Sequence, residues 1–148
     1  MEQVNLNLKT MIKFEKKNKP ATEEDIKEFE RSISILLPKS YKNFLLKANG
    51  GIPIITDNVK YHVKIFDPIK KEKIGQPISE FLDNLDPEYF DFLAINLLPI
   101  AITWFGDAYL IRINDEDDDS IYFADLHEAT HKKIFNSFQE FLNHLQNG

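Results

Sequence analysis

The stretch Leu37-Pro38-Lys39-Ser40-Tyr41-Lys42-Asn43-Phe44-Leu45-Leu46-Lys47-Ala48-Asn49-Gly50-Gly51 decides the fold that this sequence predicts. Pro38 suits the first turn of a helix, because its fixed φ is helical and its missing N–H has no helical partner. Gly50 can adopt the left-handed conformation that ends a helix, so a short helix with sharp ends is predicted. Its apolar residues recur at spacings of three and four, which predicts one buried face. These residues are Tyr41, Phe44, Leu45 and Ala48.

The composition predicts a single globular domain that spans residues 1–148. A chain of 148 residues suits one domain with one sizeable core and is short for two. The hydrophobic share of 43%, with 12 Phe and 5 Tyr, exceeds that of disordered chains. Burial of these side chains can therefore offset the lost chain entropy.

The charge balance favours a protein partner over a nucleic acid. The formal net charge is −6, and a negative protein repels phosphate backbones unless its lysines gather on one face. A partner with a basic surface fits this charge better. The chain has no cysteine, which excludes a disulfide framework and agrees with a reducing cytoplasm.

The sequence predicts neither secretion nor membrane insertion. Residues 1–7 lack the basic segment and apolar core of a secretory signal. The longest strongly apolar stretch, residues 97–105, is far shorter than the roughly 18 residues that a membrane-spanning helix needs. We therefore expect a cytoplasmic protein.

Helical patterns occupy both ends of the chain. Residues 4–18 form a weak amphipathic pattern that is broken at Pro20. Thr22 then suits the N-cap of a second helix, because its side chain can accept a hydrogen bond from the first turn. A closing helix is predicted to begin near His131 or Lys132, with apolar side chains at three- and four-residue spacings.

Short strands are predicted between these helices. Residues 52–66 indicate a hairpin with one solvated face, and Ser79 is placed to cap a short helix. Three further apolar or alternating runs predict an antiparallel meander, with a Gly-Asp turn and an acidic stretch between them. These runs are residues 98–105, 108–113 and 120–123.

The pentapeptide His127-Glu128-Ala129-Thr130-His131 matches the His-Glu-x-x-His motif of zinc hydrolases. On a helix this spacing places both histidines on one face to bind zinc and leaves the glutamate to activate water. Here the strand-like residues 121–123 lead directly into the motif, and no third ligand follows at the expected spacing. The preferred interpretation is a strand-to-helix corner, without catalytic residues, metal or cofactor, and a zinc hydrolase is the alternative.

An acidic stretch is a candidate for a protein interface. It does not fit a calcium-binding loop, because Ser120 and Leu126 stand where that loop needs glycine and glutamate. It predicts either a solvated hairpin tip or a cluster of charge that attracts a basic partner. Its residues are Asp115, Glu116, Asp117, Asp118 and Asp119.

Trp104, beside Phe105 and before the Gly-Asp turn, has two interpretations. Most tryptophans in such positions are buried, so we expect Trp104 to lie in the core. A tryptophan near the end of a sheet can also anchor an interface, so Trp104 remains a candidate contact for a partner.

Several segments, taken in order, resemble the SUKH superfamily, which includes bacterial immunity proteins and fungal regulators of cell-wall synthesis. The resemblance runs from about residue 20 to residue 148 and begins with the helix after Thr22. Its most specific residues lie in the stretch 37–51, in and before the Gly-Asp turn, and in the closing helix. They include Leu37, Pro38, Tyr41, Phe44, Asn49, Gly50, Gly51, Pro99, Gly106 and Phe138.

The resemblance implies an α+β fold, with N-terminal helices and a C-terminal helix packed on a largely antiparallel β-sheet. It also implies that His127 and Glu128 are corner residues rather than zinc ligands. Bacterial members bind and neutralise secreted toxins, often nucleases, so a non-catalytic immunity protein is implied, with a scaffold of the same fold as the alternative. The candidate partner-binding residues are Trp104, Asp107, Asp115, Glu116, Asp117, Asp118, Asp119 and Glu128.

Overall fold

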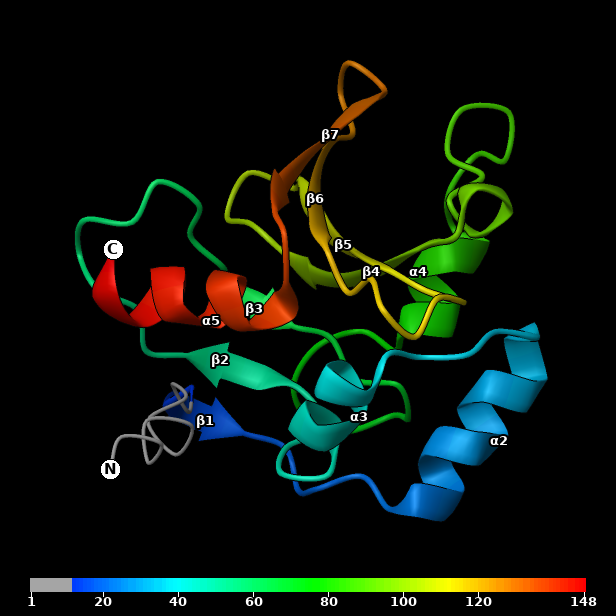
Figure 1. The fold of residues 1–148 in the computed structure, drawn as a ribbon, viewed down its shortest axis with the longest axis horizontal. Helices are drawn as coiled ribbons and strands as arrows, with labels where there is room; N and C mark the ends of the chain where they lie inside the picture. The colour runs from blue at the N-terminus through cyan, green and yellow to red at the C-terminus, as the bar shows by residue number, and fades with distance from the viewer. Residues whose placement is uncertain (1–11) are drawn as a thin grey trace.

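The computed structural model describes residues 12–148, in which helices pack on a seven-stranded sheet (Figure 1). Each strand neighbours the next strand of the chain, and every neighbouring pair is antiparallel, as the meander predicts. The strands are β1 (Phe14–Lys17), β2 (Gly51–Pro53), β3 (Ile65–Phe66), β4 (Leu97–Ile102), β5 (Ala108–Arg112), β6 (Ile121–Asp125) and β7 (Thr130–Phe135). The helices are α2 (Glu23–Ile33), α3 (Lys39–Leu45), α4 (Ile78–Asp83), the 3₁₀ turn η1 (Leu93–Ile95) and α5 (Phe138–Asn147). The α+β class is therefore confirmed.

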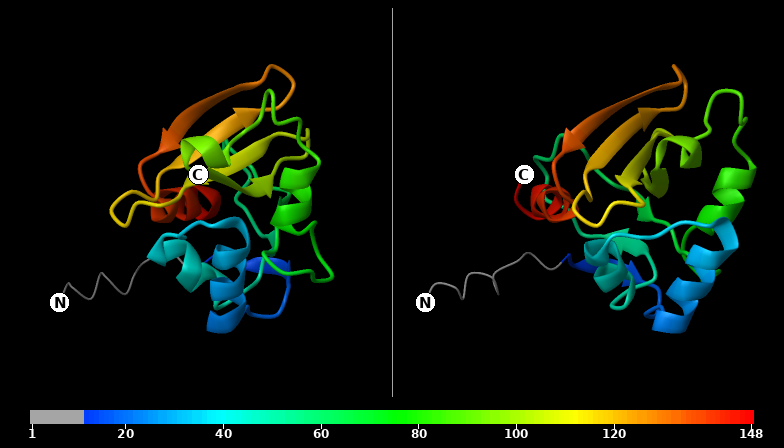
Figure 2. Two further views of the ribbon diagram at one scale, coloured as in Figure 1. Left: turned by 90° about the vertical axis from the view of Figure 1, so that its right-hand side faces the viewer. Right: turned by 45° about the vertical axis from the view of Figure 1, so that its right-hand side comes forward.

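The two faces of the sheet bury different clusters. On β5 the side chains alternate, so Tyr109 and Ile111 point into the main core, while Ala108 and Leu110 point to the opposite face. The main core is completed by side chains of α2, α3 and α5, and the opposite face is covered by residues 81–92 (Figure 2). The faces of the central strands are thus covered, and the turns that join these strands lie at the surface.

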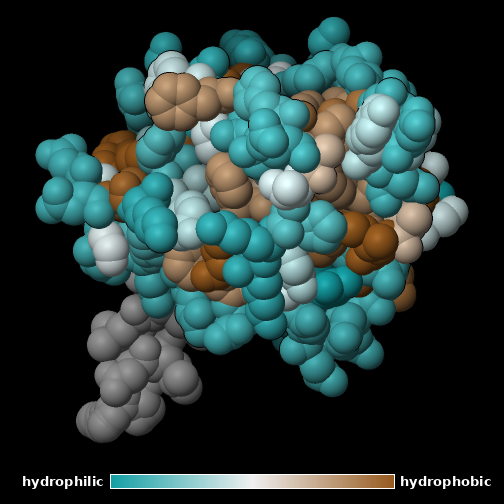
Figure 3. Space-filling view, turned by 90° about the horizontal axis from the view of Figure 1, so that it is seen from above, coloured by the Kyte–Doolittle hydropathy of each residue, from teal (hydrophilic) through white to brown (hydrophobic). Residues whose placement is uncertain are grey.

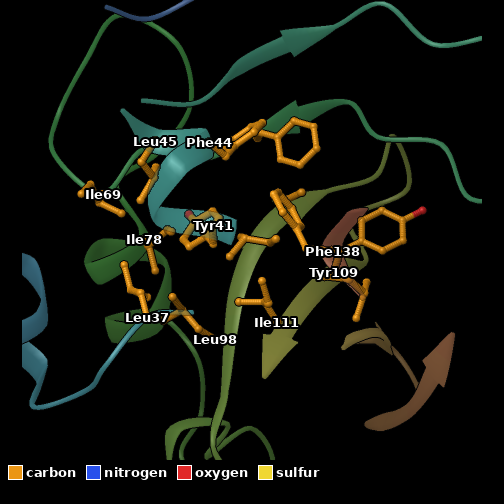
Figure 4. Close-up of a cluster of buried hydrophobic side chains, with 14 of the residues drawn as sticks. Leu37, Tyr41, Phe44, Leu45, Ile69, Ile78, Leu98, Tyr109, Ile111 and Phe138 are labelled. Atoms are coloured by element: carbon orange, nitrogen blue, oxygen red, sulfur yellow. The ribbon is translucent and has the colours of Figure 1, made fainter. Parts of the chain in front are cut away.

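The buried face predicted for residues 37–51 is confirmed (Figure 4). Leu37, Tyr41 and Phe44 are buried, and so is Phe138 of the closing helix. The ring of Phe138 meets the rings of Tyr41 and Phe44 edge to face, with centroids 5.7 and 5.3 Å apart. Such edge-to-face pairs add to the stabilisation from burial alone, so α3 and α5 are joined through this cluster.

The predicted role of Gly50 as the stop of this helix is wrong. The helix begins after Pro38, as predicted, but its last residue is Leu45. Gly50 has φ +85° and leads into β2, where a Cβ on it would collide with the carbonyl oxygen of Phe66. A Cβ on Gly51 would lie 2.6 Å from the carbonyl oxygen of Lys16. The two glycines therefore let β2 pass closely between β1 and β3.

Asn49 of the same motif anchors a loop. Its side-chain amide donates to the carbonyl of Lys70, and its side-chain oxygen accepts from the N–H of Ile69, each at 2.9 Å. Buried Asn18 in turn donates to the carbonyl of Asn49 at 2.8 Å and pairs with the backbone of Ile74. Buried amides that make several hydrogen bonds specify one backbone arrangement, so the asparagines fix residues 69–74.

Thr22 and Ser137 each cap the N-terminus of the helix that follows them. Thr22 caps α2 as predicted: its side chain accepts from the N–H of Asp25 at 3.0 Å, and the Asp25 carboxylate accepts from the N–H of Thr22. That backbone hydrogen bond lowers the pKa of Asp25. Ser137 caps α5 through its side chain, which accepts from the N–H of Glu140 at 3.1 Å.

The predicted start of the closing helix near His131 or Lys132 is wrong. Residues 130–135 form β7, which pairs with β6 from Asp125 to Ile121, and the helix begins at Phe138 after the Ser137 cap. The apolar pair Ile134 and Phe135 happens to continue the helical spacing of the residues that follow. Pairing with β6 outweighs this local pattern, because the strand satisfies backbone hydrogen bonds along a whole edge.

Three other local predictions need correction. The predicted helix of residues 4–18 lies partly outside the described residues, and its part from Phe14 to Lys17 is strand β1. In the predicted hairpin of residues 52–66, β2 and β3 pair only at Gly51 and Phe66, and a long loop joins them. Ser79 does not cap the short helix, because it lies inside α4. The N-cap is Pro77, the last residue before the helical conformation begins.

Replacing Gly50 with alanine should destabilise the fold strongly. A Cβ at this position meets backbone that cannot move without breaking the β2–β3 pairing, so we expect a loss above about 3 kcal/mol in urea unfolding. Gly106→Ala is the matched control, because Gly106 has φ +89° with no atom within 4 Å of a new Cβ. It should lose only about 1 to 2 kcal/mol from left-handed strain. Equal losses for the two variants would contradict the close-approach argument.

Asp67 should make stability fall as the pH rises from about 4 to 7. This carboxyl is buried and accepts one hydrogen bond, from the N–H of Gln76 at 3.3 Å, and burial raises its pKa from 3.8 to about 7. In this window the folded state holds a proton that the unfolded state has lost, which costs about 1.4 kcal/mol per pH unit. Asp67→Asn should remove this component in pH-dependent urea unfolding. A constant difference between wild type and variant from pH 4 to 8 would contradict it.

Candidate partner-binding surfaces

The acidic stretch forms the loop between β5 and β6, as the hairpin-tip interpretation predicts. It is tied to the segment between α2 and α3 (Figure 1). The N–H of Asn114 donates to the carbonyl of Leu36 at 2.9 Å, and the N–H of Leu36 donates to the Asn114 side chain at 2.8 Å. The Ser40 hydroxyl of α3 donates to the Asp119 carboxylate at 2.6 Å. The loop therefore has a defined position against the helices.

Three of its carboxylates are used to hold the loop. Asp115 accepts from the N–H of Asp117 at 2.9 Å, Asp118 accepts from the N–H of Ser120 at 2.9 Å, and Asp119 accepts from Ser40. Asp118 also lies 3.8 Å from the guanidinium of Arg112. Hydrogen bonding by Ser120, and then the charge of Arg112, hold the pKa of Asp118 below its ordinary value.

The side chains of Glu116 and Asp117 are the ones that the loop leaves to solvent. Both residues are exposed, and among the described residues neither carboxylate has a hydrogen bond or an ion pair. Any attraction of a basic partner by this loop therefore depends mainly on these two side chains.

The candidate acidic residues do not form one surface. Asp107 precedes β5 and the acidic loop follows it, so the length of the strand, about 17 Å, separates them. Glu128 lies in the turn between β6 and β7, at the same end of the sheet as Asp107. The N–H of Leu126 in that turn donates to the Asp107 carboxylate at 3.3 Å. The expected grouping of Asp107 and Glu128 with Asp115–Asp119 is wrong.

The prediction that Trp104 lies in the core is also wrong. Trp104 is 64% exposed and Phe105 is 74% exposed, in the turn between β4 and β5. The Thr103 hydroxyl accepts from the N–H groups of Phe105 and Asp107, each at 3.1 Å, so the chain reverses at these residues. In such a tight turn the side chains at the tip cannot reach either face of the sheet. We call residues 103–107 the aromatic turn.

A groove of about 370 Å³ lies beside the aromatic turn. Its other wall is the loop of residues 54–62, which α5 holds in place: Gln146 donates to the carbonyl of Ile54 at 2.7 Å, and the N–H of Thr56 donates to the carbonyl of Leu145 at 2.9 Å. The N–H of Tyr61 donates to Nε2 of His144 at 3.0 Å. Burial lowers the pKa of His144, which keeps that nitrogen available as an acceptor. The groove is lined by Ile55, Thr56, Asp57, Val59, His62, Trp104 and Phe105.

Sequence reasoning did not find this groove. Residues 54–62 have no periodicity that would place them, and their position depends on hydrogen bonds to α5, more than 80 residues later. The one local signal was the pair Trp104 and Phe105 directly before a glycine. Two large apolar residues at the tip of a turn cannot both be buried, so this pair indicates an exposed apolar surface.

The preferred interpretation of the His-Glu-x-x-His pentapeptide as a strand-to-helix corner is wrong, because the pentapeptide lies in the hairpin between strands β6 and β7. Residues 126–129 form the turn between β6 and β7, Ala129 has φ +55°, and His131 pairs with Ala124 in the sheet. The helical face that would bring His127 and His131 together is therefore absent from this part of the chain. Among the described residues, no three His, Cys, Asp or Glu side chains gather as a metal site.

A second hollow, of about 440 Å³, lies between β1, α3 and α5. Its described lining consists of apolar side chains, lysines, amides and one serine, so it contains no carboxylate or imidazole that could act as a general acid or base. The lining residues are Ile12, Phe14, Lys17, Ser40, Asn43, Phe44, Lys47, Phe138, Gln139 and Leu142.

The fold and its exposed turns define a class of α+β domain, in which a meander with a closing helix presents turns at both ends of the sheet. The chain belongs to the SMI1/KNR4 family (SUKH-1), whose sequence profile matches residues 20–144. It is also 32% identical over 145 residues to the SPbeta prophage-derived uncharacterized protein YokK of Bacillus subtilis (strain 168). That match covers 82% of this chain and 72% of the relative.

Family membership agrees with an immunity-type role, since SUKH proteins are generally non-catalytic immunity proteins. No helix of residues 12–148 is long and apolar enough to cross a membrane. The fold and the family predicted from the sequence are thus confirmed.

Replacing Asp119 with alanine should destabilise the protein by about 1 to 2 kcal/mol, because the Ser40 hydroxyl loses a charged acceptor. Glu116→Ala is the matched control from the same loop and should stay within about 0.5 kcal/mol of wild type. Urea unfolding measures both. Equal stabilities of the two variants would show that the Asp119 contact does not hold the loop.

Proposed function

We propose that this protein is an immunity protein, which binds a cognate secreted bacterial toxin and neutralises it without catalysing a reaction. The observation that carries the proposal is the family match over residues 20–144, because proteins of this family are generally immunity proteins. The toxin is proposed to be a nuclease, since the active surface of a nuclease is basic where it meets nucleic acid.

The charge of the chain supports this partner. A net charge of −6 speeds encounter with a basic surface and weakens encounter with nucleic acid. Exposed carboxylates are present in the turns at both ends of the sheet, where they can reach a partner without disturbing the core. Binding in the cytoplasm of the producing cell would then block the toxin before it reaches its substrate.

A scaffold that binds another intracellular protein is the second candidate. The same exposed turns would serve it, so the fold does not separate the two functions. A gene for a toxin-like protein next to the gene for this chain favours immunity, and its absence favours scaffolding. The zinc hydrolase has less support, because the hairpin at residues 126–129 separates the two histidines of its motif.

Co-expression with the toxin domain encoded by the neighbouring gene tests the proposal. Cells that produce the toxin domain alone should stop growing, and cells that also produce this protein should grow. The purified protein should form a stable complex with a catalytically inactive toxin domain in size-exclusion chromatography. Growth arrest in both strains, together with separate elution, would contradict the immunity function.

A further inference from the structure

The aromatic turn presents two neighbouring large apolar side chains to solvent. Trp104 and Phe105 are 64% and 74% exposed, and both line the groove beside the turn. The face shown in Figure 3 carries separate apolar patches among hydrophilic side chains. Single exposed apolar residues are ordinary, whereas a contiguous group beside a groove is typical of an interaction site.

Hydrogen bonds within the aromatic turn and to the β6–β7 turn keep it ordered. The Thr103 hydroxyl accepts from the N–H groups of Phe105 and Asp107, and the N–H of Leu126 donates to the Asp107 carboxylate. Nε2 of His127 lies 3.4 Å from the carbonyl oxygen of Phe105. The facing loop is fixed to α5, as described above. A surface that is already ordered loses little conformational entropy on binding, which increases affinity.

The charge around the turn is negative. Asp57, Asp107, Asp125 and Glu128 lie in or beside these loops. Asp107 and Asp125 accept hydrogen bonds from backbone N–H groups of residues 126–128, and within residues 12–148 none of the four carboxylates pairs with a lysine or arginine. Lys60, in the facing loop, and Lys64, just after it, lie over aromatic rings instead. Lys64 lies 5.0 Å from the centroid of the Trp104 ring, and Lys60 lies 5.4 Å from that of Tyr61.

We propose that the toxin docks here, with a basic surface against the carboxylates and with Trp104 and Phe105 buried as anchors. This inference rests on the proposed immunity function and assigns its binding surface. The contact of Lys64 shows that the Trp104 ring attracts a cation on one face, and its exposure leaves area for an arginine of the toxin. Tryptophan and neighbouring desolvated residues commonly dominate interface energies.

The acidic loop is the competing surface, and it fits the role less well. Residues 114–119 include no exposed large apolar side chain, and the exposed apolar residue tied to the loop, Leu36, is aliphatic and stands without an aromatic ring beside it in the sequence. Charge with so small an apolar contact increases the rate of encounter more than it increases affinity. Glu116 and Asp117 are therefore expected to contribute steering at most.

Trp104 is the only tryptophan of the chain, which makes a direct test possible. Protein produced with 5-fluorotryptophan has one fluorine resonance, which reports the environment of this ring alone. The probe is the catalytically inactive toxin domain encoded by the neighbouring gene. We expect the resonance to shift when the complex forms. An unchanged resonance in a complex confirmed by size-exclusion chromatography would overturn the proposed surface.

Alanine variants measure how much the turn contributes. Trp104→Ala and Phe105→Ala should each weaken toxin binding by roughly 30-fold or more, as interface anchors do, while their urea unfolding stays near that of wild type. Tyr89→Ala is the matched control, since Tyr89 is a 62% exposed aromatic residue in the segment that follows α4. It should change affinity less than about twofold, as residues outside an interface do.

The results separate the two proposals. If wild-type protein neither binds nor neutralises the toxin domain, the immunity function fails, and this surface fails with it. If wild type binds and Trp104→Ala and Phe105→Ala bind equally well, only the surface assignment fails. In that case loss of affinity in Glu116→Gln with Asp117→Asn would assign the interface to the acidic loop.

Discussion

Phe44 packs against aromatic rings from several segments that are distant in the chain. Its ring centroid lies 6.0 Å from that of Phe14 in β1, 5.0 Å from Phe66 in β3 and 5.3 Å from Phe138 in α5. Tyr41 of its own helix completes the group. Because interiors are close-packed, this cluster sets how α3, α5 and the first strands approach one another, and the remaining elements follow from it. The close passage of β2 between β1 and β3 then requires the two glycines that follow Asn49.

This arrangement separates the roles of core and surface. The faces of the central strands are buried, so their side chains have no access to a partner. The turns at the two ends of the central strands carry exposed carboxylates, and the turn before β5 also carries the exposed rings of Trp104 and Phe105. Long-range hydrogen bonds hold both ends, through Leu36 and Ser40 at one and through α5 at the other. The proposed immunity function needs no catalytic group, because affinity can come from the shape and charge that ordered turns present.

Local signals predicted the elements whose causes are local. The Thr22 cap, the helix after Pro38 and the strands on either side of the Gly-Asp turn were all correctly placed, since hydrogen bonds and side-chain periodicity within each segment suffice to define them. The errors occurred where pairing with another strand determines the local structure. Residues 130–135 carry part of a helical pattern and become a strand because β6 offers a paired edge. Phe14–Lys17 became a strand because β2 lies beside it.

The sequence by itself determined the α+β class, the family, the antiparallel meander and the position of the acidic stretch, because short-range periodicity, capping and turn chemistry encode these features. Only the tertiary structure decided that Asp107 and Glu128 lie far from that stretch, that Trp104 is exposed, and that residues 54–62 form a groove beside it. The physical reason is that a surface combines segments distant in the chain. Its composition depends on strand lengths and on contacts such as that between Tyr61 and His144, which no local pattern records.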